Sequence, residues 1–524
     1  MTAFDGEQAR LDLRFTVKIK EDYKRIKRQG RNLASCWGCN YLRSEGYLTE
    51  FLMESETYTG ELNYRNILFQ FVYEHGELRL YPDEKDKEVI RLRWLMSAVS
   101  PGVYVDGDPL LMEEPFLEGR CHELHGGIVF LTQIGSSVRS VNCNLVVTVL
   151  SIIKKIKISE TTTRLSLSGP CIDYVFPVNR AWRSEYDWDE MQVNGAISIT
   201  TSGFDSTTSE RFNVQVEGKE VCAYFSVGWT VSHGIENPPI TLSAILSFEF
   251  EETNDYSFFL KLWYQAERFL GFMTGQSEVG PLSGRLGCQM ENGKYRNYAE
   301  MELAEQPSEF DAKHLSKGRY LTLDKLEGNE EKLFRDIADN NIYLRHLPRT
   351  NKDKHVIDAA RFVLVTAAFE WEFQRLYPDG VPKRAARLKG EKRALEIIEK
   401  EIESSTGEIK QALKRAKLSI GFTNLQSKVV YAAKQFSSVI DVFGKRLYDL
   451  NEEEFKCSKI GERLANQRNN FAHGNIDKDF EGVAILDLVY LGYLILAMQL
   501  RNCGISDKGI QRAINSQFGL HIAV

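Results

Sequence analysis

Arg468 and His473 are the two side chains in this sequence whose types and spacing suit chemistry on a phosphate. They lie five positions apart in the stretch "RNNFAHG", which ends at Gly474. An arginine guanidinium binds a phosphate through paired hydrogen bonds. A histidine titrates near neutral pH, so it can donate or accept a proton at a reacting oxygen. Together the two residues predict phosphate binding beside acid–base chemistry.

A helix is expected to carry this stretch and to end within it. Side chains advance about 100° per residue around a helix, so Arg468 and His473 lie about 140° apart if both are helical. Because "GNID" is a turn signal, we expect His473 at the last helical position, on one face with Asn469. The negative end of the helix dipole favours a protonated histidine by ~0.3–1 kcal/mol. A histidine before a C-cap glycine is also ordinary helix-end chemistry, so the spacing leaves both interpretations open.

The chain that positions this helix divides into a β-rich part and an all-helical part. Segments rich in β-branched and aromatic residues, separated by turn residues, predict one or two antiparallel sheets in the first part. From residue 355 the sequence is helical throughout. We therefore expect an α+β multidomain protein, with a β-rich region at 1–350 and an all-α domain at 351–524. Alternatively, the β-rich region at 1–350 divides into two parts near 255–275.

Individual elements follow from the same patterns. "YTGEL" at 58–62 is interpreted as a turn, and the apolar run 483–498, interrupted by Asp487, as a buried bundle helix or a subunit contact rather than a membrane span. The predicted strands are 12–19, 66–74, 77–81, 126–134, 144–153, 196–201, 222–229 and 244–252. The predicted helices are 256–273, 355–377, 391–403, 407–418, 424–446, 458–473 and 481–502.

Composition indicates a reduced, cytoplasmic protein. The chain has 43% hydrophobic and 27% charged residues, which is ordinary for a globular protein. Nine cysteines, an odd number spread along the chain, favour free thiols over a disulfide framework. The N-terminus lacks the pattern of a secretory signal. Residues 351–524 carry 27 Lys and Arg against 22 Asp and Glu, a balance of +5, whereas the remainder carries 39 against 51, or −12. This asymmetry suggests a polyanionic partner for the C-terminal part.

The motif in its setting resembles the HEPN superfamily. The R-x4-6-H motif of that superfamily corresponds here to Arg468, four intervening residues and His473, with the polar Asn469 directly after the arginine. The aromatic helix near residue 370 and the apolar helix at 481–502 match the arrangement around that motif. With the β-rich region ahead of it, including "SCWGCN" and "YTGEL", the chain resembles the ApeA-type anti-phage proteins, which are abortive-infection ribonucleases. The resemblance is firmer over 355–524 than over the N-terminal part.

The resemblance implies a metal-independent endoribonuclease without a cofactor. In such enzymes the ribose 2′-OH attacks the adjacent phosphate and leaves 2′,3′-cyclic phosphate and 5′-OH ends. Arg468 would stabilise the transition state, His473 would act as acid or base, and Asn469 would orient the phosphate or the histidine. Glu370 is a candidate accessory residue, although an ordinary helix glutamate is the simpler interpretation. A homodimer or higher homo-oligomer, formed through the HEPN domain, would supply the second histidine.

The resemblance also implies partners. RNA with accessible loops, such as the anticodon loop of tRNA, is the expected substrate. The N-terminal region would restrain the site and sense a phage product. The alternative is a non-catalytic HEPN protein that binds nucleotides, RNA or partners. Two basic runs are the predicted RNA contacts, although a solvated helix face explains them as well. Their cations are Lys383, Arg384, Arg387, Lys389, Lys392, Arg393, Lys414, Arg415 and Lys417.

Cysteine and histidine pairs in the first part suggest a zinc site only weakly. Cys36 and Cys39 form a CxxC pair, and Cys121, His122 and His125 follow about 80 residues later without matching spacing. We therefore expect no metal. The phosphate-binding glycine motifs and the HExxH metalloprotease motif are absent from the sequence, so nucleotide-driven and metalloprotease activities have no support.

Overall fold

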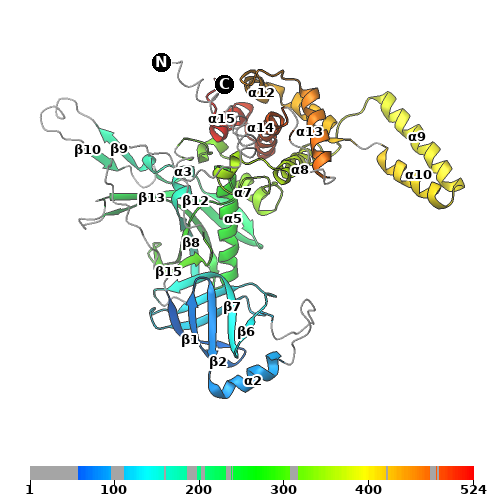
Figure 1. The fold of residues 1–524 in the computed structure, drawn as a ribbon. Helices are drawn as coiled ribbons and strands as arrows, with labels where there is room; N and C mark the ends of the chain where they lie inside the picture. Colours follow the sequence, from blue (N-terminus) through cyan, green and yellow to red (C-terminus); the bar gives the residue numbers. More distant parts are fainter. Residues whose placement is uncertain are drawn as a thin grey trace, which may run out of the picture.

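A computed structural model describes most of the chain, and Figure 1 shows its path. His473, Cys36 and Cys39, and the predicted strand 12–19, lie outside the described residues. The structure describes residues 57–95, 111–157, 161–185, 198–201, 207–231, 238, 240–306, 315, 317–420, 423–472, 480 and 483–523.

Six antiparallel strands close on themselves at one end of the molecule (Figure 1). Closure depends on β7, whose residues Leu145–Thr148 pair with β3 while Val149–Lys154 pair with β5. Inward and outward side chains alternate, as in β2, where Ile67, Phe69, Phe71 and Tyr73 are buried. The strands are β1 (Tyr58–Tyr64), β2 (Ile67–Glu74), β3 (Glu77–Pro82), β4 (Phe116–Cys121), β5 (Ile128–Thr132) and β7 (Asn144–Lys155), with α2 (Glu84–Leu95) and the short β6 (Arg139–Val141) beside them.

The far half of β7 also pairs with β15, and from there the sheet continues as an open antiparallel layer. The order outward from β7 is β15 (Tyr295–Leu303), β14 (Ser283–Gln289), β8 (Thr162–Ser168), β13 (Ile240–Thr253), β12 (Lys219–Val231) and β11 (Phe212–Val216). Smaller elements flank it, namely α3 (Pro170–Val175), β9 (Trp182–Glu185) and β10 (Ser198–Thr201). The predicted antiparallel, β-rich first region is confirmed. The predicted turn at 58–62 is wrong, because those residues begin β1.

The helix predicted at 256–273 is confirmed as α5 (Tyr256–Thr274), which links the sheet to the helical region. Asp255 caps its first turn by accepting a hydrogen bond from the backbone N–H of Phe258, and Gly275 ends it in the left-handed conformation at φ 66°. Trp263 and Phe269 are fully buried on it. Helix α7 (Glu330–Ala338) packs against both α5 and β11.

The remaining helices form a bundle with a projecting pair. The bundle comprises α8 (Ala359–Leu376), α11 (Leu425–Gln435), α12 (Ser437–Asp449), α13 (Cys457–Ala472), α14 (Ala484–Cys503) and α15 (Asp507–Phe518). The pair, α9 (Ala385–Ser404) and α10 (Gly407–Ser419), extends away from it (Figure 1). The predicted helix 424–446 is two helices, because the chain leaves helical geometry at Phe436. The sequence patterns did not predict α15.

Helix α14 is the core helix of this bundle. It is the one helix among the described residues long and apolar enough to cross a membrane, yet 78% of its apolar window is buried inside the protein. It contacts α8, α12, α13 and α15. The predicted buried bundle helix is therefore confirmed.

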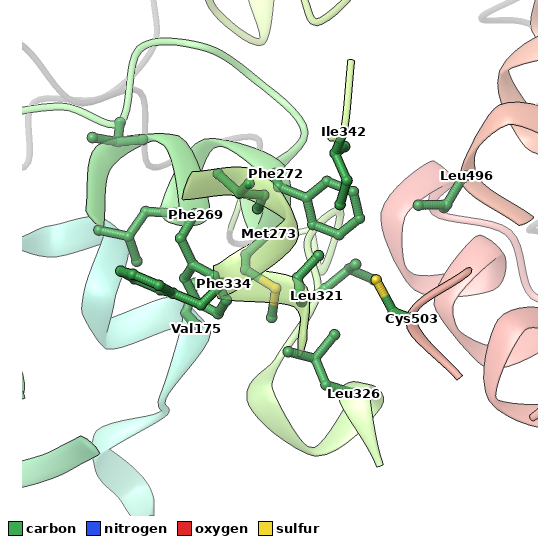
Figure 2. Close-up of a cluster of buried hydrophobic side chains, with 14 of the residues drawn as sticks. Val175, Phe269, Phe272, Met273, Leu321, Leu326, Phe334, Ile342, Leu496 and Cys503 are labelled. Atoms are coloured by element: carbon green, nitrogen blue, oxygen red, sulfur yellow. The ribbon is translucent and has the colours of Figure 1, made fainter. Parts of the chain in front are cut away.

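The described residues form two hydrophobic cores. One fills the closed strand ring. The other runs without interruption from the open sheet through α5 and α7 into the bundle. Figure 2 shows side chains where these layers meet, among them Phe272 and Leu321 from one side and Leu496 and Cys503 from the other. The boundary near 349–354 stays a prediction, but this core crosses it.

Candidate active site

The site is built on α13, whose inner face is a regular stripe. Ile460, Leu464, Gln467 and Phe471 recur at intervals of three and four and are buried, because these positions share one side of a helix. This face contacts α8, α11 and α14. Arg468 directly follows the buried Gln467. Its side chain is therefore at the edge of the packed face and is 39% exposed.

Arg468 binds the carboxylate of Glu370, which lies 98 positions earlier in the chain on α8. Its Nη2 donates to Oε2 at 3.2 Å. The other oxygen of Glu370 accepts a hydrogen bond from Nζ of Lys428 on α11 at 3.0 Å. Three helices thus bring together two cations and one carboxylate. The cluster carries a formal charge of +1 at neutral pH.

This geometry suits anion binding. Glu370 fixes one edge of the guanidinium, while an arginine has five N–H donors in a planar fork. The partial exposure of Arg468 leaves the group in contact with solvent. Lys428 is 16% exposed and reinforces the positive field from the other side of the carboxylate. A phosphate approaching Arg468 would therefore meet a net positive, pre-oriented pair of cations.

Aromatic packing fixes the end of α13. Phe471 contacts Phe362 of α8 edge-on, with ring centroids 5.6 Å apart. Phe480, which lies just beyond the segment that holds His473, contacts both rings at 5.3 and 5.9 Å. The chain therefore leaves α13 and returns to the same three-ring cluster. Asn469 is exposed on α13, and His473, which lies outside the described residues, follows Ala472 directly in sequence.

An ion pair whose carboxylate is fully buried holds α13 against α14. Arg463 donates to Asp487 through Nε at 2.7 Å and through Nη2 at 2.6 Å, and Tyr448 of α12 donates to the same carboxylate. Asp487 is fully buried. Burial and the neighbouring carboxylate raise the pKa of Tyr448 far above its usual value, so its hydroxyl remains a donor. These contacts set the rotation of α13 and hence the position of Arg468.

The predicted RNA-binding cations lie on and beside the projecting pair of helices, and several are already paired. Glu391 binds Lys383 at 2.7 Å and Arg387 at 2.9 Å. Glu396 binds Arg393 at 3.4 Å, and Glu399 binds Lys417 at 2.6 Å. Within the described part of the chain, four of the cations form no ion pair, namely Arg384, Lys389, Lys392 and Lys414.

The weak zinc candidates separate into two groups. Cys36 and Cys39 are outside the described residues, and His125 is exposed. The thiol of Cys121 donates to Glu123 at 3.0 Å, and burial together with this bond raises its pKa to about 11. No three His, Cys, Asp or Glu side chains of the described ranges gather as a ligand set.

Two features of the site escaped the sequence patterns. Lys428 is one cation among many in a helical region, and nothing local marks it as a neighbour of Glu370 across 58 positions. The Arg463–Asp487 pair had a usable signal, since an aspartate inside an apolar helix is rarely buried without a cation. Glu370, named from sequence only as a candidate accessory residue, contacts Arg468, and its role in the site stays a prediction.

The geometry therefore provides an oriented arginine in a positive cluster at the end of α13. Comparison of the chain with protein-family models, curated proteins and solved structures found no match.

Proposed function

We propose that this protein is a metal-independent HEPN endoribonuclease that acts in the cytoplasm in anti-phage abortive infection. The observation that carries the proposal is the Arg468–Glu370–Lys428 cluster, which orients an arginine for phosphate binding at the end of the helix that precedes His473. The resemblance of "RNNFAHG" to the HEPN motif supplies the reaction class.

In the proposed reaction, His473 removes the proton from a ribose 2′-OH, which attacks the adjacent phosphorus atom. Arg468 stabilises the charge that develops on the phosphoryl oxygens. A second histidine protonates the departing 5′-oxygen, which leaves a 2′,3′-cyclic phosphate and a 5′-OH end. One chain offers one such histidine, so a homodimer completes the site. Glu370 positions Arg468, and Asn469 orients the phosphate or His473.

The proposed substrate is an RNA with an exposed single-stranded loop, such as a tRNA anticodon loop. An unpaired loop presents its 2′-OH and bases for in-line attack. Arg384 and Lys414, which lack an ion pair to described residues, are the proposed backbone contacts. The N-terminal region, with its balance of −12, restrains the site and responds to a phage product.

The test compares purified wild-type protein with His473→Ala and Arg468→Ala on total tRNA, with and without EDTA, and with lysate of phage-infected cells as the trigger. Lys459→Ala, which removes an exposed cation at the start of α13, is the matched control. The proposal predicts EDTA-resistant cleavage that both site variants lose and the control keeps. Intact tRNA under all conditions, together with retained RNA binding, would support the non-catalytic binding protein instead.

A further inference from the structure

A pocket of about 400 Å³ opens where the closed strand ring, the open sheet and α5 meet. Its walls come from β7, from the end of β15, from α5 and from the loop that follows α5. A pocket of this volume is large enough to hold a small molecule. None of its described lining residues belongs to α8, α11 or α13, so it is separate from the cluster around Arg468.

The pocket is negatively charged. Three carboxylates line it, and its described lining residues include no lysine, arginine or histidine. The three are Glu267 on α5, Glu278 in the loop after it and Glu305 just beyond β15. Within the described part of the chain, neither Glu267 nor Glu305 forms an ion pair. The charge of the cavity therefore favours a cationic occupant.

Glu267 separates this cavity from an ordinary acidic surface. Its Oε1 accepts a hydrogen bond from the indole N–H of Trp263 at 3.0 Å, and Trp263 is fully buried. Burial raises the pKa of Glu267, although the bond from Trp263 acts in the opposite direction. The carboxylate is thus held in place and partly removed from water, and no cation of the described residues balances it. A cation that entered the pocket would offset this cost.

An aromatic ring and apolar walls lie beside this carboxylate. Tyr264 is three positions before Glu267, so both side chains lie on one face of α5. Burial raises the pKa of Tyr264, and the nearby charge of Glu267 raises it further. An ammonium group at Glu267 can therefore also contact the face of a tyrosine ring. Four aliphatic side chains complete the walls, namely Val149, Leu150, Val279 and Leu303.

One of the three carboxylates already binds a cation of the chain itself. The Nε of Arg349 donates to Glu278, and the arginine side chain is 77% exposed. Two backbone bonds hold the segments together, because the N–H groups of Ser277 and Glu278 donate to the carbonyls at 348 and 349 at 2.8 and 2.9 Å. An exposed ion pair contributes little to stability, so a ligand can replace the guanidinium at Glu278 without breaking these backbone bonds.

We propose that this pocket binds a polyamine, a small molecule with two or more ammonium groups joined by methylene chains. One ammonium group lies at Glu267 beside the ring of Tyr264, and the methylene chain lies against the aliphatic walls. A further ammonium group lies at Glu278 or Glu305. Carboxylates and apolar walls in one cavity match both parts of such a molecule.

Other cations match the pocket less well. A divalent metal ion requires several oxygen ligands around it, whereas much of this wall is aliphatic. A free basic amino acid carries its own carboxylate, which the three glutamates repel. RNA is repelled for the same reason. The inference does not rest on the proposed function, because neither Arg468 nor His473 takes part in it.

The test is isothermal titration calorimetry of the full chain, freed of nucleic acid by nuclease treatment, with putrescine and spermidine at constant ionic strength. We expect saturable binding at one site. Glu267→Gln should raise the dissociation constant at least ~10-fold, because one charge-assisted hydrogen bond is lost. Glu251→Gln, which neutralises an exposed carboxylate on β13 outside the pocket, should bind as the wild type does.

Two further measurements separate the pocket from a diffuse acidic surface. Ser277→Trp keeps all three carboxylates but places a large ring at an exposed lining position, and it should abolish binding. In thermal unfolding, putrescine should raise the melting temperature of wild type and of Glu251→Gln but not of Glu267→Gln. Without ligand, Glu267→Gln should be at least as stable as the wild type, because an unbalanced, partly buried charge is removed.

Several results would overturn the inference. They are the absence of saturable binding by either polyamine, undiminished binding by Glu267→Gln or Ser277→Trp, and equal binding of butanediol, which has the same chain without the charges. Displacement of putrescine by an equal concentration of Mg²⁺ would show diffuse charge attraction instead, and tighter binding of free arginine would replace the ligand class. These readouts use no RNA, so polyamine binding by a protein that leaves tRNA intact would remove the nuclease proposal alone.

Discussion

Arg468 and Glu370 form an ion pair between helices that lie 98 positions apart in sequence, with 3.2 Å between Nη2 and Oε2. The second oxygen of Glu370 accepts from Lys428 at 3.0 Å. The carboxylate therefore fixes both cations where α8, α11 and α13 meet. Because Arg468 is still 39% exposed, its position is held without closing it off from an incoming anion.

Replacing Glu370 by glutamine should slow cleavage without unfolding the protein. The amide keeps the size of the side chain but no longer fixes the guanidinium by charge, so we expect kcat to fall about tenfold, or ~1.4 kcal/mol of activation free energy. KM for tRNA should change less. Glu462→Gln, an exposed glutamate on α13, is the control. A Glu370→Gln enzyme with wild-type kcat would show that the pair has no role in positioning.

Replacing Asp487 by asparagine should destabilise the helical bundle. The change removes the counter-charge of Arg463 and weakens the bond from Tyr448 in a fully buried position. We expect a loss of ~2–4 kcal/mol in the free energy of unfolding, below the value for a wholly buried pair because Arg463 is 30% exposed. Urea denaturation followed by helical circular dichroism measures it.

Lys459→Ala serves as the matched control for that experiment, because it breaks only an exposed pair with Glu454. Its stability should lie within about 0.5 kcal/mol of the wild type. Equal denaturation midpoints for the Asp487 variant and this control would contradict a structural role for the buried pair.

Stability should fall between pH 6.5 and pH 4 because of His346, which lies between α7 and α8. Burial, with a smaller contribution from the charge of Arg361, lowers the pKa of His346 to about 4, although a hydrogen bond to the backbone of Tyr343 acts in the opposite direction. Below pH 6.5 the unfolded chain takes up a proton that the folded protein does not, so unfolding is favoured as the pH falls. Near pH 4 this proton uptake lowers the free energy of unfolding by up to ~3 kcal/mol.

Denaturation of wild type and His346→Gln at several pH values isolates this effect. The difference in unfolding free energy between the two proteins should narrow or reverse in favour of the variant as the pH drops from 7 to 4. Parallel pH profiles would exclude His346 as the source.

Residues 351–524 should not fold as a separate fragment. Leu496 and Cys503 of α14 belong to the same core as Leu321, Phe334 and the inner face of α5 (Figure 2). Glu327 also accepts hydrogen bonds from Ser506 at the start of α15 and from Arg512. We expect the isolated fragment to lack a cooperative thermal transition by circular dichroism. A stably folded fragment would restore the simple two-domain boundary near 350.

Local patterns predicted most elements and missed those set by distant contacts. Residues 58–62 have a turn-like glycine, yet they form a strand because β2 and β4 pair with them on both sides. Glycine suits that place because a side chain at Gly60 would meet the carbonyl of Arg120. The break at Phe436 reflects packing of its ring in the core, which an amphipathic period does not reveal. The strand ring closes because β7 pairs with both β3 and β5. The sequence pattern does not reveal the register of those pairings.

The candidate site was predictable in its residue types and only partly in its geometry. Arg468 was identified from its place in the motif. Glu370 and Lys428 lie on other helices, and their distance along the sequence does not reveal that they meet at Arg468 in the fold. Glu370 was named only as a candidate accessory residue, with an ordinary helix glutamate as the simpler interpretation. The relation of Arg468 to His473 stays a prediction, since His473 lies outside the described residues.

The most direct measurement counts new 5′-hydroxyl RNA ends in phage-infected cells that express wild type, Arg468→Ala, His473→Ala or the Lys459→Ala control at matched protein levels. The proposed function predicts discrete ends in tRNA with wild type and control, and a loss of at least ~100-fold in either site variant. Ends that persist undiminished in Arg468→Ala, or tRNA that stays intact with wild type while phage growth is blocked, would contradict it.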